Sequence, residues 1–594
     1  MDRPASKAPR PALIVTTGAA QTVVGPLVND APGCYTCFAT RRRLARPNNA
    51  AKDADERRWM ESDQRPQPLL DVIAMHTLTT IIKLEIDDST ITPYQRSVVI
   101  FDHWNLTASR HLFLIDPLCP ECSDLPEDTA EAGTLSLQTR IKSRPDQYRL
   151  SAAVEKLDQL RSTYVDSETG LIHAVRRDNQ GGLAISAALM KLRRHDWVEP
   201  GFGRSMNYDE SEATAILEAL ERYGGVQPGA RRTAIVGSYD ALQPDAVDPR
   251  LFGVHPEDTY TSGAYPYRRF QRDLECAWVW AFSFAANGPV LVPESTAYYY
   301  VAHDSQQLPF TSEVSNGCAL GGSIEEAILF GLLEVVERDA FLLTWYAQLP
   351  IPELDLTSAA DQSLRIQASL LEQETGYIIR LFDQTTENGI PTVWAMAEDA
   401  RSSLTDTVRP ARVCAAGAHL NLERAALSAI SELGPFLKDF ISRFPTNAER
   451  ALAMARDSTL VRNMEDHATV YGSAEASSRF AFLSESQMSS FSERSKLHVE
   501  IASSDLRDDV YDFVERLDRC GQDVIVVDQT TDEHRAAGLS CVKVLVTGSL
   551  TMTFGHALRR TENIDRLLSV PALLGYREKP LDQADINPFP HPFP

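Results

Sequence analysis

The segment from Ser315 to Phe341 predicts a helix with glutamates on one side and apolar residues on the other. At 100° per residue, Glu326, Glu334 and Glu337 fall within an arc of roughly 80°. Like charges held together repel one another, so this arrangement favours a divalent cation or a proton that neutralises them. We expect Mg²⁺, a hard cation that is bound by one or two carboxylates together with substrate phosphates.

A second predicted amphipathic helix, at 211–225, repeats this pattern. Glu218, Glu221 and Arg222 have the ExxER spacing that the first helix has at 334–338. For either helix alone, the alternative is an ordinary solvated face stabilised by pairs at i,i+3 and i,i+4. Because two helices carry the same acid, acid and arginine triplet, we expect them to form one composite site.

These two segments resemble the YcaO family, whose members bind ATP between helices that carry ExxER motifs. The motif SNG, a glycine-rich bend and the run EEA followed by GLLEVVERDA carry the resemblance, which extends from about Tyr164 to the C-terminus. It implies an α+β fold of helices packed on mixed sheets over residues 150–594. It also implies an ATP-dependent peptide cyclodehydratase that forms azolines.

The resemblance also implies which residues bind the nucleotide and its Mg²⁺ ions. No P-loop pattern GxxxxGK[ST] occurs in the sequence, so nucleotide binding is expected from the acidic helices and one loop. The implied residues are Glu218, Glu221, Ser315, Asn316, Glu326, Glu334, Glu337 and Arg338.

The composition is that of an ordinary soluble enzyme. The chain has 594 residues, of which 43% are hydrophobic and 24% charged, enough for two or three cores. The net charge of -24 argues against a nucleic-acid-binding surface. No run approaches the roughly 18 apolar residues that span a bilayer, and the first residues lack a signal-peptide core. We therefore expect a cytoplasmic protein with neither a nucleic acid nor a membrane as partner.

Four of the nine cysteines form two CxxC pairs in turn-like surroundings. Cys34 and Cys37 make the first pair, and Cys119 and Cys122 make the second. Two such pairs supply four thiolates for tetrahedral Zn²⁺, and a site filled by four sulfurs has no open position for catalysis. We predict a structural zinc ion. The alternatives are two unrelated pairs or one redox-active CxxC.

The region before Gln147 resembles the trailing portion of an E1-like (ubiquitin-activating-enzyme-like) domain. VVGPLVNDAPGCYTCFATRRR and HLFLIDPLCPECSD carry this resemblance. It implies a small, zinc-stapled α/β domain over residues 1–145, and the polar stretch at 123–148 predicts a linker. Neither a glycine-rich adenylate-binding loop nor a leader-binding winged helix precedes these segments, so we expect a truncated E1-like region.

The resemblance further implies a set of partners. A separate E1-like protein is expected to bind the leader of a ribosomally made precursor peptide and to present that peptide. An azoline dehydrogenase and a second copy of the chain are further expected partners, as in thiopeptide and other antibiotic biosynthesis.

The chain ends with INPFPHPFP, which places prolines at Pro588, Pro590, Pro592 and Pro594. Alternating prolines favour an extended polyproline II form, so the last seven residues could reach about 20 Å. Taken alone, such an end is more often an interaction tail. By resemblance, a PxPxP tail enters the active site of azoline-forming cyclodehydratases, and we expect the Pro594 carboxylate to act as a general base.

The implied reaction is attack by a Cys, Ser or Thr side chain of the peptide on the preceding backbone carbonyl. ATP then phosphorylates the former amide oxygen, and loss of phosphate leaves a thiazoline or oxazoline. Ser428 and Pro435 depart from the arginine and glutamine that the family often has at these positions. This departure keeps a rival open, a non-catalytic scaffold that binds leader peptide or partner enzymes. Thioamide or macroamidine formation is a further alternative.

Overall fold

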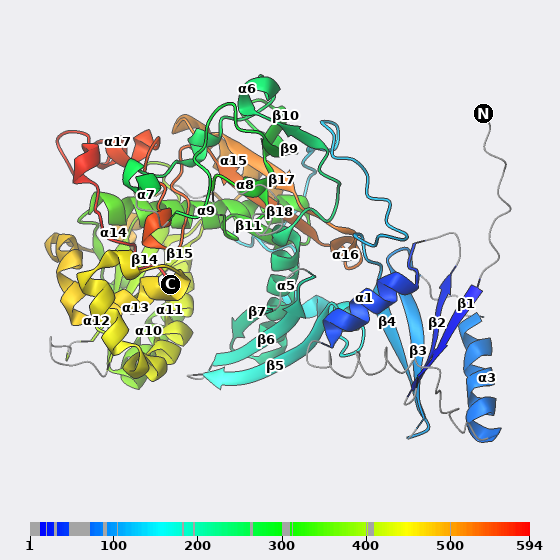
Figure 1. Ribbon diagram of the computed structural model, residues 1–594. Helices are drawn as coiled ribbons and strands as arrows, with labels where there is room; N and C mark the ends of the chain where they lie inside the picture. Colours follow the sequence, from blue (N-terminus) through cyan, green and yellow to red (C-terminus); the bar gives the residue numbers. More distant parts are fainter. Residues whose placement is uncertain are drawn as a thin grey trace.

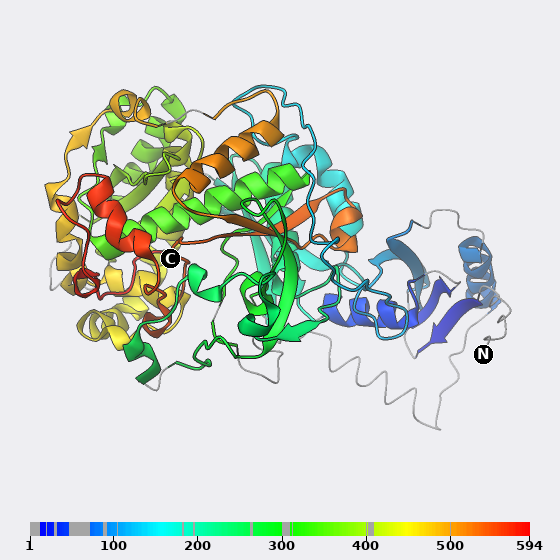
Figure 2. The ribbon, with the colours of Figure 1, turned by 90° about the horizontal axis from the view of Figure 1, so that it is seen from above.

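The fold was analysed in a computed structural model, and both views place the N-terminal sheet at one end of the molecule (Figures 1 and 2). Among the described residues, no helix has the length and apolar character needed to cross a bilayer. The structure describes residues 12–18, 21–28, 32–46, 72–86, 92–103, 105–180, 183–193, 197–261, 265–299, 309–311, 313–399, 401, 409–498 and 501–594.

The N-terminal region is an antiparallel sheet in the order β1-β2-β3-β4 with a helix on each face. Side chains alternate across β3, so Val98 and Ile100 pack with Phe38 of α1 while Val99 and Phe101 pack on the α3 side. The elements are β1 (Ala12–Thr17), β2 (Gln21–Val28), α1 (Tyr35–Ala45), α3 (Val72–Ile86), β3 (Gln95–Asp102) and β4 (Thr107–Leu114).

The predicted linker is irregular but closely packed. Residues 123–148, all of which the structure describes, form neither a helix nor a strand longer than a single bridge. Lys142 forms a buried ion pair with Asp509, and the Tyr148 hydroxyl donates to the Ile501 carbonyl. The segment is therefore held along the surface of the larger region.

A three-stranded antiparallel sheet carries the first acidic helix, α5 (Tyr208–Val226), which the sequence predicts at 211–225. Gly201 and Gly203 allow this helix to lie directly on the sheet, because a Cβ on Gly203 would be 1.8 Å from the Ser211 carbonyl oxygen. The strands are β5 (Ile172–Gln180), β6 (Leu183–Lys191) and β7 (Val198–Ser205), and α4 (Leu157–Tyr164) precedes them.

A six-stranded sheet in the order β10-β9-β17-β18-β11, with β8 beside β9, forms the centre of the molecule. The second acidic helix, α9 (Ile324–Ala347), begins at the Ser323 cap and is buried over most of its surface. The other elements are β8 (Ile235–Gly237), β9 (Cys276–Ser283), β10 (Gly288–Pro293), β11 (Cys318–Gly321), α15 (Leu506–Arg519), β17 (Val524–Asp528), α16 (Asp532–Arg535) and β18 (Ser540–Val546).

A third layer is the sheet β15-β14-β13-β12-β16, in which only the β12–β16 pair of the described strands is parallel. Helices α10 and α11 cover one face of this sheet. The elements are β12 (Glu353–Leu354), α10 (Gln362–Thr375), β13 (Ile378–Asp383), β14 (Thr392–Glu398), β15 (Arg412–Ala418), α11 (Leu422–Arg443) and β16 (Met488–Ser489).

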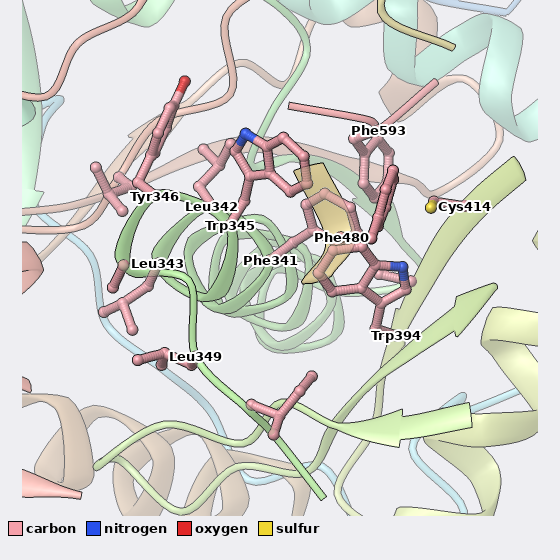
Figure 3. Packing of buried hydrophobic residues seen from close by; sticks show 14 of the residues in the cluster. Phe341, Leu342, Leu343, Trp345, Tyr346, Leu349, Trp394, Cys414, Phe480 and Phe593 are labelled. Carbon is pink, nitrogen blue, oxygen red and sulfur yellow. The ribbon is translucent and has the colours of Figure 1, made fainter. Parts of the chain in front are cut away.

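The last part of the chain packs onto the C-terminal half of α9. Figure 3 shows Phe593 beside Phe341 of α9, with Trp394 and Phe480 in the same apolar cluster. The remaining helices are α6 (Tyr239–Leu242), α7 (Glu257–Thr261), α8 (Glu294–Ala297), α12 (Ala448–Arg456), α13 (Met464–Gly472), α14 (Phe491–Ser495) and α17 (Asp565–Leu573). The predicted α+β class, with helices packed on mixed sheets, is confirmed.

Candidate functional site

Helices α5 and α9 rest on the same two strands, β11 and β18 (Figure 1). Gly224 and Gly225 bring the end of α5 onto these strands, since a Cβ on Gly224 would lie 2.6 Å from the Cys541 sulfur. Gly331 does the same for α9, where a Cβ would lie 2.6 Å from Val544 Cγ2. Small residues next to each ExxER motif thus fix the distance between the two acidic helices.

On α5, Glu218 is held at the edge of the neighbouring sheet. Its carboxylate accepts a hydrogen bond from the Phe202 backbone N–H at 2.6 Å and an ion pair from Arg222 at 2.8 Å. Arg222 also pairs with Glu199 of β7 at 2.7 Å. The first glutamate and the arginine of this motif therefore have fixed positions.

Glu221 links the two helices electrostatically. Burial raises its pKa well above the usual value, and the nearby charges of Glu334 and Glu218 raise it further. Because Glu334 belongs to α9, the two helices bring their acids together as the repeated motif predicts. This unfavourable charge is what a bound cation would neutralise.

On α9, Glu334 accepts a hydrogen bond from the Gly317 N–H at 2.9 Å, and burial raises its pKa. Burial also raises the pKa of Glu337 to about 7, although Arg338 opposes the shift. Arg338 lies 3.6 Å from both carboxylates, which is longer than a hydrogen bond. The positive charge of Arg338 therefore only partly offsets the negative charges of Glu334 and Glu337.

The acids lie less close together than ligands of a closed metal site. Among the described residues, no three of these carboxylates form a group with oxygens within 4.8 Å of one another. Such spacing suits Mg²⁺ ions that take one or two carboxylates each and complete their shell with phosphate oxygens. Half-buried acids such as Glu221, Glu334 and Glu337, whose pKa values are raised, fit that role.

The loop before β11 contributes a polar side chain next to this group. Asn316 is buried, and its carboxamide oxygen has no hydrogen-bond partner among the described residues. A buried acceptor without a partner indicates a missing ligand or water. Ser315 is half-buried beside it, and its carbonyl accepts from the Cys318 N–H at 2.7 Å. Gly317, whose N–H reaches Glu334, has a φ of 79° that favours glycine.

Glu326 differs from the other predicted glutamates because it is buried and pairs with an arginine outside the ExxER motifs. The residue is 4% exposed, and its carboxylate accepts from Arg149 at 2.8 Å and from the Leu150 N–H at 3.2 Å. Arg149 also lies over the Phe330 ring, and its charge lowers the pKa of Glu221. Glu326 therefore positions an arginine that the sequence analysis did not identify.

Helix α11 contacts β7 through an ion pair. Glu432 pairs with Arg204 of β7 at 3.1 Å, and its charge raises the pKa of Glu337. Pro435 lies buried inside the same helix without ending it. Arg204 was also missed, since nothing in the local pattern sets it apart from other surface arginines.

The C-terminal residues enter the larger region and reach Arg338. The Phe589 carbonyl accepts from the Trp345 indole N–H at 3.0 Å, and the His591 carbonyl accepts from His467 Nδ1 at 2.9 Å. Pro590 to Phe593 are buried and Pro594 is half-buried. The Phe593 ring lies 3.9 Å from the Arg338 guanidinium carbon. The tail thus ends beside the acidic group, and the role of Pro594 stays a prediction.

The four predicted zinc ligands lie together in the N-terminal region. Cys34 and Cys37 stand at the start of α1, and the loop after β4 supplies Cys119 and Cys122. The sulfur of Cys34 lies 3.6 Å from that of Cys119, and all four sulfurs lie within 4.8 Å of one another. Four thiols in this arrangement fit a tetrahedral zinc ion.

A buried ion pair connects the cysteine region to α5. Arg41 of α1 donates to Glu533 at 2.6 Å, and the Tyr223 hydroxyl donates to the same carboxylate at 2.6 Å. Tyr223 follows the ExxER arginine directly. The two regions are therefore mechanically joined.

Comparisons with known proteins agree with this geometry. A family model described as YcaO cyclodehydratase, ATP- and Mg²⁺-binding, matches residues 202–550, which is more than half of the chain. An uncharacterized protein of Methanothermobacter thermautotrophicus is 26% identical over 287 residues, which cover 48% of this chain and 67% of that protein. A second one, encoded in the tfuA 3′ region of Rhizobium leguminosarum bv. trifolii, is 27% identical over 270 residues, covering 42% of this chain and 60% of that protein.

Solved structures share the fold of nearly the whole chain. A heterocyclase in complex with substrate and cofactor matches with a TM-score of 0.74 and 21% identity, covering 98% of this chain and 78% of that one. The heterocyclase TruD matches with a TM-score of 0.64 and 22% identity, covering 98% of this chain and 75% of that one. The shared fold therefore includes the N-terminal region.

Proposed function

The chain belongs to the YcaO family, and we propose that it catalyses ATP-dependent cyclodehydration of Cys, Ser or Thr residues in a ribosomally synthesised peptide. The observation that carries this proposal is that α5 and α9 pack on the same two strands and bring Glu221 near enough to Glu334 for the charge of Glu334 to raise the pKa of Glu221. Two ExxER helices whose acids repel one another in a half-buried site are suited to hold the Mg²⁺ ions of a nucleotide.

The reaction that this site would support keeps a simple balance of atoms. The peptide side chain adds to the preceding carbonyl carbon, and the γ-phosphoryl group of ATP passes to the former amide oxygen. The carbon–oxygen bond then breaks, so that phosphate leaves and a thiazoline or oxazoline forms, with ADP as the second product. Phosphoryl transfer depends mostly on positioning and charge neutralisation.

The site residues would share these tasks. Mg²⁺ supplies neutralisation of the phosphate charge when bound. Arg338 would face the phosphates, and the unpaired Asn316 oxygen and Ser315 would line the loop beside them. Glu326 would act through Arg149, which it orients. The ions would be held by the remaining acids, Glu218, Glu221, Glu334 and Glu337.

Ring formation removes two protons, one from the attacking side chain and one from the amide nitrogen. The Pro594 carboxylate is our candidate for the general base, because the buried tail carries it towards Arg338 and the acids. The hydrogen bonds to Phe589 and His591 would hold it in place.

The N-terminal region would support the catalytic region. We propose a zinc-binding domain over residues 1–145, held by Cys34, Cys37, Cys119 and Cys122, and a catalytic domain over 150–594. A separate leader-binding protein would present the peptide, and an azoline dehydrogenase would act on the product.

The test is turnover of a precursor peptide with its leader-binding partner and Mg·ATP, read by mass spectrometry. We expect the loss of one water mass per ring, and no loss with Glu337→Gln. The matched control is Glu515→Gln, which changes an exposed acid paired with Arg519 on α15. An unchanged peptide mass with the native chain would favour the non-catalytic scaffold. Exchange of one oxygen for sulfur in place of water loss would indicate thioamide formation, and a water loss that fragmentation places between an amine and a backbone amide would indicate a macroamidine.

A further inference from the structure

The aromatic residues of the tail make two equivalent contacts with arginines. Phe589 lies 3.9 Å from the Arg479 guanidinium carbon, and Phe593 lies 3.9 Å from that of Arg338. Arg479 belongs to the 3₁₀-helical segment Ala474–Glu485, whereas Arg338 belongs to the ExxER motif of α9. The same type of contact therefore occurs once outside the acidic group and once within it.

Phe593 is itself rigidly placed. It is 7% exposed, and its ring meets that of Phe341 edge to face, with centroids 5.0 Å apart and planes at 87°. The His591 carbonyl, two residues earlier, is fixed by His467. A ring held from two sides gives a guanidinium group a defined surface to lie on.

Arg338 has little else to define its position. Its described ion pairs with Glu334 and Glu337 are both 3.6 Å long, too long for good hydrogen bonds. A guanidinium that lies flat on an aromatic face keeps its N–H groups directed outward in the ring plane. With its guanidinium carbon 3.9 Å from the Phe593 ring centroid, Arg338 has one side against the ring, and its N–H groups would remain available to a ligand.

We propose that Phe593 is a positioning residue that orients Arg338 for the nucleotide phosphates. This inference rests on the proposed function for the identity of the ligand, although the contact itself does not. It also gives the tail a second task, separate from proton transfer at Pro594. Seating of the tail and binding of the nucleotide would then be coupled through one aromatic ring.

The experiment compares Phe593→Leu, Phe593→Tyr and the control Phe589→Leu in the full chain. Leucine removes the ring and keeps the apolar bulk, whereas tyrosine keeps the ring. We expect Phe593→Leu to weaken Mg·ATP binding by about three- to ten-fold, in proportion to the loss of a partly desolvated cation–π contact. Phe593→Tyr and Phe589→Leu should change affinity by less than about two-fold.

A second measurement follows the contact without any nucleotide. The Nε–H signal of Arg338 in ¹⁵N-arginine-labelled protein is assigned by its loss in Arg338→Lys. We expect this signal to move downfield in Phe593→Leu, as the ring current is removed, and to stay in place in Phe589→Leu.

The two readouts separate the possible failures. An Arg338 signal that does not respond to Phe593→Leu overturns the inference, whatever the nucleotide data show. If the signal moves but Phe593→Leu binds Mg·ATP as the native chain does, the coupling to the nucleotide is refuted. If the native chain binds no Mg·ATP, the proposed function fails, and with it the coupling, while the signal still decides the contact.

Discussion

The cysteine cluster and the acidic group differ in how complete a set of cation ligands the chain itself supplies. The four sulfurs lie within 4.8 Å of one another and come from two segments that close around a single point. The carboxylates of the two ExxER motifs are spread over α5 and α9 and are half-buried, and burial raises the pKa values of Glu221, Glu334 and Glu337. A complete set of protein ligands makes a structural site, whereas an incomplete and strained set needs a substrate to complete it.

The region of the cysteine cluster and the acidic helix α5 are also joined by direct contacts. The ion pair of Arg41 with Glu533 and the hydrogen bond from Tyr223 connect α1 to the helix that carries Glu218 and Glu221. The cysteine cluster is therefore placed to support the helix that carries two of the acids.

Zinc loss should have the largest effect. Structural zinc contributes roughly 10–16 kcal/mol in small peptides, so the double variant Cys34→Ser, Cys37→Ser should unfold the N-terminal sheet. Elemental analysis should give one zinc per native chain and none in the variant, and hydrogen exchange should rise in α1 and β4. Glu218→Gln should leave the exchange of these elements unchanged. If the double variant stayed folded without metal, the cysteine cluster would not be a structural metal site, and this difference from the acidic group would disappear.

Removing one partner of the connecting ion pair should come next. Arg41→Met leaves Glu533 charged and buried, which costs about 3–5 kcal/mol. The neighbouring Arg42→Met is the control, because Arg42 pairs with the more accessible Glu168 and should cost about 1 kcal/mol or less. Chemical denaturation measures both. Equal losses would mean that the buried pair has no special part in joining the regions.

Acid should release the tail before it disrupts the cysteine region. Burial lowers the pKa of His467 to about 4, with His591 opposing the shift through its backbone carbonyl. His467 accepts from the Gly555 N–H and donates to His591, so its neutral form is the one that holds the tail. Stability from this group is complete above pH 6.5 and is lost as the pH falls from 6.5 towards 4, by roughly 3 kcal/mol in total.

Carboxypeptidase digestion or hydrogen exchange of the tail across pH 7 to 4.5 measures this release. His556 and Asp466 shift the pKa of His467 in opposite directions, and the His591 ring stacks on the His467 ring with centroids 4.0 Å apart. The variant His467→Asn should make tail exchange nearly independent of pH in this range. Pronounced pH dependence in that variant would assign the release to another group.

The smallest expected effect is a gain in stability. Because the folded state raises the pKa of Glu221, its charged form opposes folding at neutral pH. Glu221→Gln should therefore stabilise the ligand-free protein by about 1 kcal/mol or less, seen as a slightly higher melting temperature, while removing most of the affinity for ATP. A lower melting temperature would contradict the account of a strained acidic group.

Local patterns predicted the parts of both sites that repeat within one segment. The ExxER spacing gave α5 and α9 because helical periodicity is written in consecutive residues, and the CxxC pairs gave the cysteine cluster for the same reason. The runs containing Val279, Val526 and Val544 were likewise recognisable as strands.

Contacts between distant segments could not be predicted in this way. Arg149 directly follows the predicted linker at 123–148, and only its pairing with Glu326, far along the chain, brings it to the site. Glu533 looks like an ordinary surface acid until folding brings Arg41 and Tyr223 to it. The same holds for the position of Phe593 on Arg338, which only the path of the tail determines.

The most direct test of the central claim is calorimetric titration of Mg·ATP into the native chain, Glu221→Gln, Glu334→Gln and the double variant. If α5 and α9 form one nucleotide site, the native chain binds with one nucleotide per chain, each single change removes most of the affinity, and the double change adds little further loss. Binding that survives either single substitution at native strength would show that the two acidic helices do not share a nucleotide.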